Sequence, residues 1–141
     1  MEVHILLAED NEGEIQLISE ALAVSALSIS VSVVRDGRQA IHFVRREGVY
    51  SNAKKPDLIL LDIGLPEING MNVLCEIKQD TVLRAIPVII LTGSSTNRDV
   101  IECYRNHANC FITKPADFDH YRDLVGVIED YWFGIVKLPR H

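Results

Sequence analysis

Residues 57–62 read DLILLD, four branched apolar residues enclosed by two aspartates. Residues 88–91, VIIL, form a second run of the same kind. A strand with water on one side alternates apolar and polar residues, whereas a strand covered by helices on both faces is apolar throughout. The two runs therefore predict buried strands of a parallel sheet and exclude a sheet with one exposed face.

Three more segments rich in Val, Ile and Leu, bounded by polar or turn residues, complete a set of five expected strands. The five are Val3–Ala8, Ile29–Val34, Asp57–Leu61, Pro87–Thr92 and Cys110–Thr113. Between them apolar residues recur at helical spacing, and after the fifth strand this stripe includes Tyr121, Leu124, Val125, Ile128 and Trp132. Strands that alternate with helices are joined by right-handed crossovers. We therefore expect a three-layer, doubly wound α/β domain around a five-stranded parallel sheet.

The length of 141 residues suits one compact domain with a core of its own. We expect residues 1–141 to form a single domain without an output domain. Residues 130–141 are expected to be an apolar C-terminal extension of it. Any output must then come from the surface of this domain.

Charge and composition exclude several classes of function. The formal net charge is −6 and no run of Lys and Arg is longer than two, which disfavours a nucleic-acid-binding surface. No apolar run approaches the length of a membrane span, and the N-terminus lacks the features of a secretory signal. The three cysteines include no Cys-x-x-Cys pair and are expected as reduced thiols. The sequence predicts a cytoplasmic protein that binds neither nucleic acid nor membrane.

Polar side chains follow four of the expected strands. Glu9 and Asp10 come after the first, Asp62 after the third, Thr92 ends the fourth, and Lys114 comes after the fifth. Ligands of such sheets bind outside the carboxyl ends of the strands. Three carboxylates, a hydroxyl and an ammonium are therefore expected at one edge of the sheet.

These residue types suit phosphoryl transfer. Crowded carboxylates repel one another unless a cation lies among them, and Mg²⁺ (or Mn²⁺) prefers oxygen ligands. An aspartate is ionised at neutral pH and attacks phosphorus without a general base, which makes Asp62 the candidate nucleophile. Lys114 and Thr92 would donate to the phosphoryl oxygens. The product would be an acyl phosphate, formed from an energetic donor such as a phosphohistidine on a partner kinase.

The chain resembles the response-regulator receiver domains of two-component signalling. The resemblance is carried by Glu9-Asp10, by the run from Asp62 to Gly70, by Leu91-Thr92-Gly93 and by Thr113-Lys114-Pro115, in the family's order. It extends over essentially the whole chain. It implies a flavodoxin-like fold with strand order 2-1-3-4-5, and a phosphoacceptor switch that catalyses only its own phosphorylation and dephosphorylation.

The same resemblance implies the role of each site residue. Asp62 would accept the phosphoryl group, with Lys114 and Thr92 beside it, and the metal ligands would be Glu9, Asp10, Asp62 and the backbone carbonyl of Gly64. Thr92 and Phe111 match the family's switch pair, although Phe111 lacks the hydroxyl of members that have Tyr there. A cis peptide between Lys114 and Pro115 is also expected, because X-Pro bonds adopt the cis form at low cost.

A narrower resemblance concerns the partner. Residues 107–115 and 131–139 look like those of small stand-alone regulators that accompany bacterial, especially cyanobacterial, phytochrome histidine kinases. It implies a sensor histidine kinase of the phytochrome type as partner, with an unknown downstream protein.

The apolar extension predicts self-association. Its residues Trp132, Phe133, Ile135, Val136 and Leu138 are seldom left in water. We expect a homodimer through the fifth helix and this extension, because a two-fold contact is the commonest way to bury such a patch. Packing of the extension onto its own domain is the alternative.

Three other functions fit the sequence less well than a receiver does. A phosphatase of the haloacid-dehalogenase type needs a second Asp two residues after the nucleophile, where this chain has Gly64. A flavodoxin-like cofactor site needs Ser, Thr and Gly after the first strand, whereas residues 9–12 read EDNE and would repel a phosphate. A degenerate receiver acting as a scaffold would not need intact acidic, Thr and Lys positions.

Overall fold

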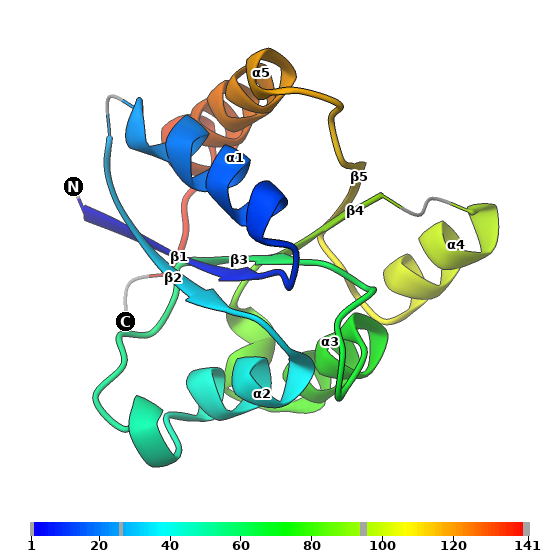
Figure 1. Ribbon diagram of the computed structural model, residues 1–141. Coiled ribbons are helices and arrows are strands. Elements are labelled where there is room, and N and C mark those ends of the chain that lie inside the picture. Colours follow the sequence, from blue (N-terminus) through cyan, green and yellow to red (C-terminus); the bar gives the residue numbers. More distant parts are fainter. Residues whose placement is uncertain (1, 26, 94–95, 140–141) are drawn as a thin grey trace.

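The structure is a computed structural model that describes residues 2–25, 27–93 and 96–139. Within these residues one parallel sheet has the strand order β2-β1-β3-β4-β5 (Figure 1). The strands are β1 Glu2–Ala8, β2 Ser28–Val34, β3 Leu58–Leu61, β4 Val88–Thr92 and β5 Cys110–Thr113. The helices are α1 Glu12–Ala23, α2 Gly37–Arg45, α3 Gly70–Gln79, α4 Asn97–Arg105 and α5 Phe118–Ile128. The predicted fold class and strand order are confirmed.

Helices cover both faces of the sheet. In Figure 1, α1 and α5 lie on one face, and α2, α3 and α4 lie on the other. Side chains of neighbouring residues in a strand point to opposite faces of the sheet. Leu6 belongs to a hydrophobic cluster with residues of α2, α3 and α4 (the α2–α3–α4 cluster), and Leu7 belongs to a cluster with residues of α1 and α5 (the α1–α5 cluster). This division explains why β3 and β4 are apolar at consecutive positions, since both sides of these strands are buried.

Each of the five α-helices begins at a residue whose side chain accepts a hydrogen bond from the first turn. These N-caps are Asn11, Asp36, Asn69, Thr96 and Asp117. Such caps satisfy backbone N–H groups that have no partner within the helix. Because each helix runs antiparallel to the strand before it, its partly positive N-terminal end lies at the edge where the strands end.

The fifth helix differs from the prediction. The apolar stripe suggested one helix that continues through Trp132, but α5 ends at Ile128 and residues Glu129–Ile135 form a π-helical segment. In that segment the N–H of Val136 donates to the carbonyl of Tyr131, 2.9 Å away, a bond that spans five residues. The altered register lets the adjacent Trp132 and Phe133 both pack against the α1–α5 cluster.

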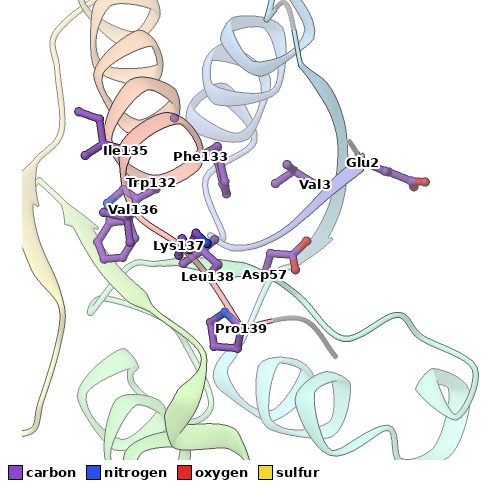
Figure 2. A pocket seen from close by; sticks show the side chains of 11 residues that line it. Glu2, Val3, Asp57, Trp132, Phe133, Ile135, Val136, Lys137, Leu138 and Pro139 are labelled. Atoms are coloured by element: carbon purple, nitrogen blue, oxygen red, sulfur yellow. The ribbon is translucent and has the colours of Figure 1, made fainter.

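Residues 132–139 lie next to the edge of the sheet where the strands begin. Residues 132–139, with Glu2, Val3 and Asp57, enclose a cavity of about 450 Å³. Figure 2 shows these side chains around it, with Phe133 on the side of Val3. Arg140 and His141 of the expected extension lie outside the described residues. The alternative of packing onto the chain's own domain thus holds for Trp132 and Phe133, whereas Ile135 is 76% exposed.

Two expectations from composition can be compared with the structure. None of the described helices combines the length and the apolar character needed to cross a bilayer. Cys75, Cys103 and Cys110 are free thiols, as expected. Burial raises the pKa of each, so none is activated as a thiolate.

Replacing Trp132 with Ala tests the packing of the extension. We expect the free energy of unfolding to fall by about 2 kcal/mol, since a half-buried indole leaves the α1–α5 cluster. Urea unfolding followed by circular dichroism measures the change. The control is Val49→Ala, which should change stability by no more than about 0.5 kcal/mol because that side chain is 93% exposed. Equal losses in both variants would contradict the packing.

Candidate functional site

The strand ends bring five polar side chains to one edge of the sheet. Glu9 directly follows β1, Asp62 directly follows β3, and Lys114 directly follows β5, while Thr92 is the last residue of β4. Glu9, Asp62 and Thr92 are buried, with exposed fractions of 2%, 7% and 3%, and Asp10 is exposed. Hydrogen bonds between neighbouring strand ends hold the positions. Asp62 N donates to the Ala8 carbonyl at 3.1 Å, and Lys114 N donates to the Thr92 carbonyl at 2.9 Å.

Lys114 joins the two buried carboxylates. Its ammonium Nζ donates to Asp62 Oδ2 at 3.0 Å and forms an ion pair with Glu9 Oε1. The Lys114 side chain is 13% exposed, so these ion pairs are far less screened than those at the surface. Two strand ends that would otherwise repel each other are therefore held by one cation from a third strand.

Backbone amides hold the remaining carboxylate oxygens. Glu9 Oε2 accepts from the N–H groups of Asp10 and Asn11, at 3.0 and 3.2 Å. Asp62 Oδ1 accepts from the N–H of Gly64 at 3.0 Å. Asn11 also caps α1, a contact that sequence reasoning missed although an Asn before an apolar-periodic segment is a helix-start signal. Each buried carboxylate thus has one oxygen on the backbone and the other on Lys114.

The acidic residues fit a divalent cation. Glu9, Asp10 and Asp62 each offer a carboxylate oxygen, and these three atoms lie within 4.8 Å of one another. All are hard oxygen donors of the kind that Mg²⁺ and Mn²⁺ prefer. One ammonium faces three carboxylates, so the cluster keeps an excess of negative charge that a cation would neutralise. The Asp10 carboxylate is exposed, so an ion bound to it would be in contact with solvent and could keep several water ligands.

The two buried carboxylates differ in acidity. Burial raises the pKa of Glu9 to about 7, and the charge of Asp62 adds to the rise, against the lowering effect of the Lys114 hydrogen bond. Burial acts on Asp62 in the same direction, but the Gly64 amide, the Lys114 ammonium and the Thr92 side chain together lower its pKa. Hydrogen bonds to both carboxylates outweigh burial and raise the pKa of Lys114. At neutral pH Asp62 is therefore the ionised carboxylate and Lys114 is protonated.

Thr92 and Phe111 lie on one face of neighbouring strands. Phe111 of β5 is opposite Ile90 of β4, two residues before Thr92, and all three face the α2–α3–α4 side. The Phe111 ring is half-buried there, and its backbone N–H donates to the hydroxyl of Tyr104 on α4 at 3.2 Å. The predicted switch residues are thus close to each other and to α4.

The Lys114–Pro115 bond corrects one prediction. No peptide bond is cis among the residues that the structure describes, so this bond is trans and the predicted cis-proline at Pro115 is wrong. The trans form of an X-Pro bond is favoured by about 0.5–1 kcal/mol in the absence of other constraints. Since the Lys114 ammonium reaches both carboxylates from the end of β5, no cis bond is needed to direct it into the site.

Comparison with known proteins gives consistent matches. Residues 5–126 match the response regulator receiver domain family. Response regulator Rcp1 from Synechocystis sp. is 41% identical over 135 residues, which are 96% of this chain and 92% of that protein. The crystal structure of the phosphorylated cyanobacterial phytochrome response regulator RcpA has a TM-score of 0.94 at 44% identity, covering 99% of this chain and 100% of that one. The Mn²⁺-bound form of Rcp1 has a TM-score of 0.91 at 40% identity, covering 98% and 99%.

Lys114→Met tests how far the ammonium compensates the two acids. We expect the free energy of unfolding in EDTA to fall by about 3 kcal/mol, because Glu9 and Asp62 both lose their cationic partner. Excess Mg²⁺ should reduce the difference in unfolding free energy between the variant and the intact chain, since the ion neutralises the carboxylates in place of the ammonium. Urea unfolding with and without Mg²⁺ measures both effects. Lys137→Met, at an exposed position, is the control and should lose no more than about 0.5 kcal/mol. If Mg²⁺ leaves the difference in unfolding free energy between Lys114→Met and the intact chain unchanged, a divalent cation does not lie among these acids.

Proposed function

The chain belongs to the response regulator receiver domain family, and from this premise we propose that it accepts a phosphoryl group on Asp62 and passes the change to a partner protein. The observation that carries the proposal is the state of Asp62. It is buried, ionised, bonded to Lys114 and placed beside Glu9 and Asp10. No other carboxylate among the described residues combines these features.

The chemistry is a single phosphoryl transfer. A carboxylate oxygen of Asp62 attacks phosphorus, the bond between phosphorus and the donor nitrogen breaks, and the released imidazole nitrogen takes up a proton. Glu9, Asp10, Asp62 and the Gly64 carbonyl would hold a Mg²⁺ or Mn²⁺ ion, which would supply positive charge to the phosphoryl oxygens. Lys114 and Thr92 donate to those oxygens, so the protein acts by positioning and by electrostatic stabilisation. In a separate step, water attacks phosphorus, the bond between phosphorus and the Asp62 oxygen breaks, and inorganic phosphate leaves, which returns Asp62 to its carboxylate form.

The proposed donor is a phytochrome-type sensor histidine kinase. Support comes from the names of the similar proteins: RcpA is described as a cyanobacterial phytochrome response regulator, and RtBRR, at 37% identity and a TM-score of 0.79, as a bacteriophytochrome response regulator. The structure of RcpA is of its phosphorylated form. We propose that this chain acts as a cytoplasmic single-domain regulator in the same kind of phosphorelay.

Thr92 and Phe111 are proposed to couple the site to the surface formed by α4, β5 and α5. When the Thr92 hydroxyl moves toward the phosphoryl oxygens it leaves space beside β5, and the half-buried Phe111 ring can move into that space. A packing change between two arrangements of this kind is a common switch. Tyr104 of α4 lies beside this position, since its hydroxyl accepts from the backbone N–H of Phe111. An unidentified downstream protein would read this surface.

Self-association is proposed through α5 and the π-helical segment. Val127, Tyr131 and Ile135 lie four residues apart and are 64%, 50% and 76% exposed. Residues four apart share one side of a helix, so they form an apolar stripe beside the packed Trp132 and Phe133. A second copy of the chain can cover such a stripe with the same stripe around a two-fold axis.

Asp62→Asn is the direct test of the phosphoryl site. The intact chain, incubated with acetyl phosphate and Mg²⁺ or with a phytochrome-type kinase and ATP, should gain one phosphoryl group by intact-mass spectrometry. The variant should gain none, because an amide oxygen is not a nucleophile of comparable strength. Asp123→Asn, an exposed aspartate on α5, is the matched control and should be phosphorylated like the intact chain. Persistent mass gain in Asp62→Asn would refute the assignment.

Tyr131→Glu tests the proposed dimer. Light scattering at micromolar concentration should give a dimer mass for the intact chain and a monomer mass for the variant, since a charge in an apolar contact is left without a partner. Gln79→Glu adds the same charge at an exposed position of α3, on the opposite face of the sheet, and should remain dimeric. The measurement is repeated with the phosphorylated protein, because phosphorylation can tighten the contact. Monomers throughout would show that α5 and the extension serve the chain's own domain alone.

A further inference from the structure

The start of α2 is packed tightly against the loop that follows Asp62. Gly37 is buried, and its N–H donates to the carbonyl of Pro66 at 3.1 Å. A Cβ atom built on Gly37 would lie 1.6 Å from the carbonyl oxygen of Ile68 and 2.9 Å from the Ile68 Cβ. Two backbones therefore approach at a distance that a side chain on Gly37 would prevent. Asp-Gly in a sequence indicates a turn or a helix start, and it gives no sign of this contact.

The loop in question, residues 63–69, carries the backbone that surrounds the nucleophile. Gly64 N donates to Asp62 Oδ1, and Gly64 is also the residue whose carbonyl is proposed as a metal ligand. Leu65, next along the chain, is 5% exposed and belongs to the α2–α3–α4 cluster. The far end is fixed where Gly70 N donates to the Ile63 carbonyl at 2.9 Å.

Between these fixed points the loop exposes Pro66 and Glu67 to solvent. Glu67 has φ of +67°, a left-handed conformation that a residue with a side chain seldom adopts and that its surroundings must hold. The contact with Gly37 falls on the residues before and after Glu67. The contact with Gly37 thus supports the part of the loop that has the unfavourable backbone conformation. Without it the loop could change conformation, which would shift Gly64 relative to Asp62.

We propose that Gly37 is a positioning residue for the metal site: by excluding a side chain, it lets the start of α2 clamp residues 66–68 and so holds the Gly64 backbone over Asp62. The inference rests on the proposed function, since it takes the Gly64 carbonyl as a ligand. Mg²⁺ demands close to ideal octahedral geometry, so a carbonyl displaced by a fraction of an ångström is a poorer ligand. Groups that orient ligands commonly change metal affinity by tenfold or more when lost.

Gly37→Ala is the decisive variant, and Gly126→Ala is its matched control. Gly126 is also a helical glycine, on α5, but a Cβ there would meet nothing within 4 Å. Isothermal titration with Mg²⁺ should give a dissociation constant about tenfold higher for Gly37→Ala and an unchanged one for Gly126→Ala. Amide exchange in EDTA supplies a readout that needs no metal. Residues 63–69 should exchange faster in Gly37→Ala, whereas α5 should exchange as in the intact chain.

The outcomes separate this inference from the proposed function. If the intact chain does not bind Mg²⁺, the proposed function fails. The amide exchange of residues 63–69 in EDTA still shows whether Gly37 holds the loop. If the intact chain binds and a folded Gly37→Ala binds equally with unchanged exchange, the inference is overturned. Should Gly37→Ala not fold, Ile68→Ala removes the apposed side chain and adds no atoms. It must then raise the dissociation constant and loop exchange relative to Gly126→Ala, and unchanged values overturn the inference.

Discussion

The whole site depends on one ammonium group shared between two buried carboxylates. Parallel strands that end at one edge bring Glu9 and Asp62 together, and burial leaves little water to screen their repulsion. Lys114 offsets this repulsion from the end of β5, two strands away from β3. A buried ion pair of this kind is seldom more stable than well-packed apolar residues of the same size. Its presence is therefore better explained by chemistry that needs charge at this place than by stability of the fold.

Stability comes from elsewhere in the molecule. Two hydrophobic clusters, one on each face of the sheet, bury consecutive residues of the central strands. At the edge where the strands begin, Trp132 and Phe133 extend the α1–α5 cluster with apolar contacts. The two edges thus differ: one is packed with aromatic side chains and the other with acids and a lysine. A fold with its stabilising contacts distributed in this way can tolerate an electrostatically costly site at one end.

The periodicity of apolar residues and the polar residues at strand ends were enough to predict most of the fold and the site. Sequence reasoning failed where contacts between distant segments determine the local structure. Apolar runs and alternation predicted the five strands to within one residue of their observed starts, and the ends of the strands brought together Glu9, Asp62, Thr92 and Lys114. The trans bond at Pro115 could not be predicted, because both isomers of an X-Pro bond are close in energy and the surroundings choose. The π-helical segment was missed because the same apolar stripe suits an α-helix. The close contact between Gly37 and Ile68 was missed because Asp-Gly at the start of a helix is most often a turn or cap signal, and Ile68 is remote in sequence.

On the proposed function, the distribution of hydrogen bonds at the site gives a route by which phosphorylation of Asp62 would be sensed elsewhere. Each buried carboxylate has one oxygen fixed by backbone amides and the other held by Lys114. The backbone bonds fix one oxygen of each acid, whereas the flexible lysine side chain can follow the negative charge. If a phosphoryl group on Asp62 draws Lys114 toward its oxygens, the ion pair between Lys114 and Glu9 weakens, and a cation among the acids becomes more important for Glu9. On the proposed function, the metal requirement, the role of Lys114 and the response of Thr92 would all follow from one redistribution of charge.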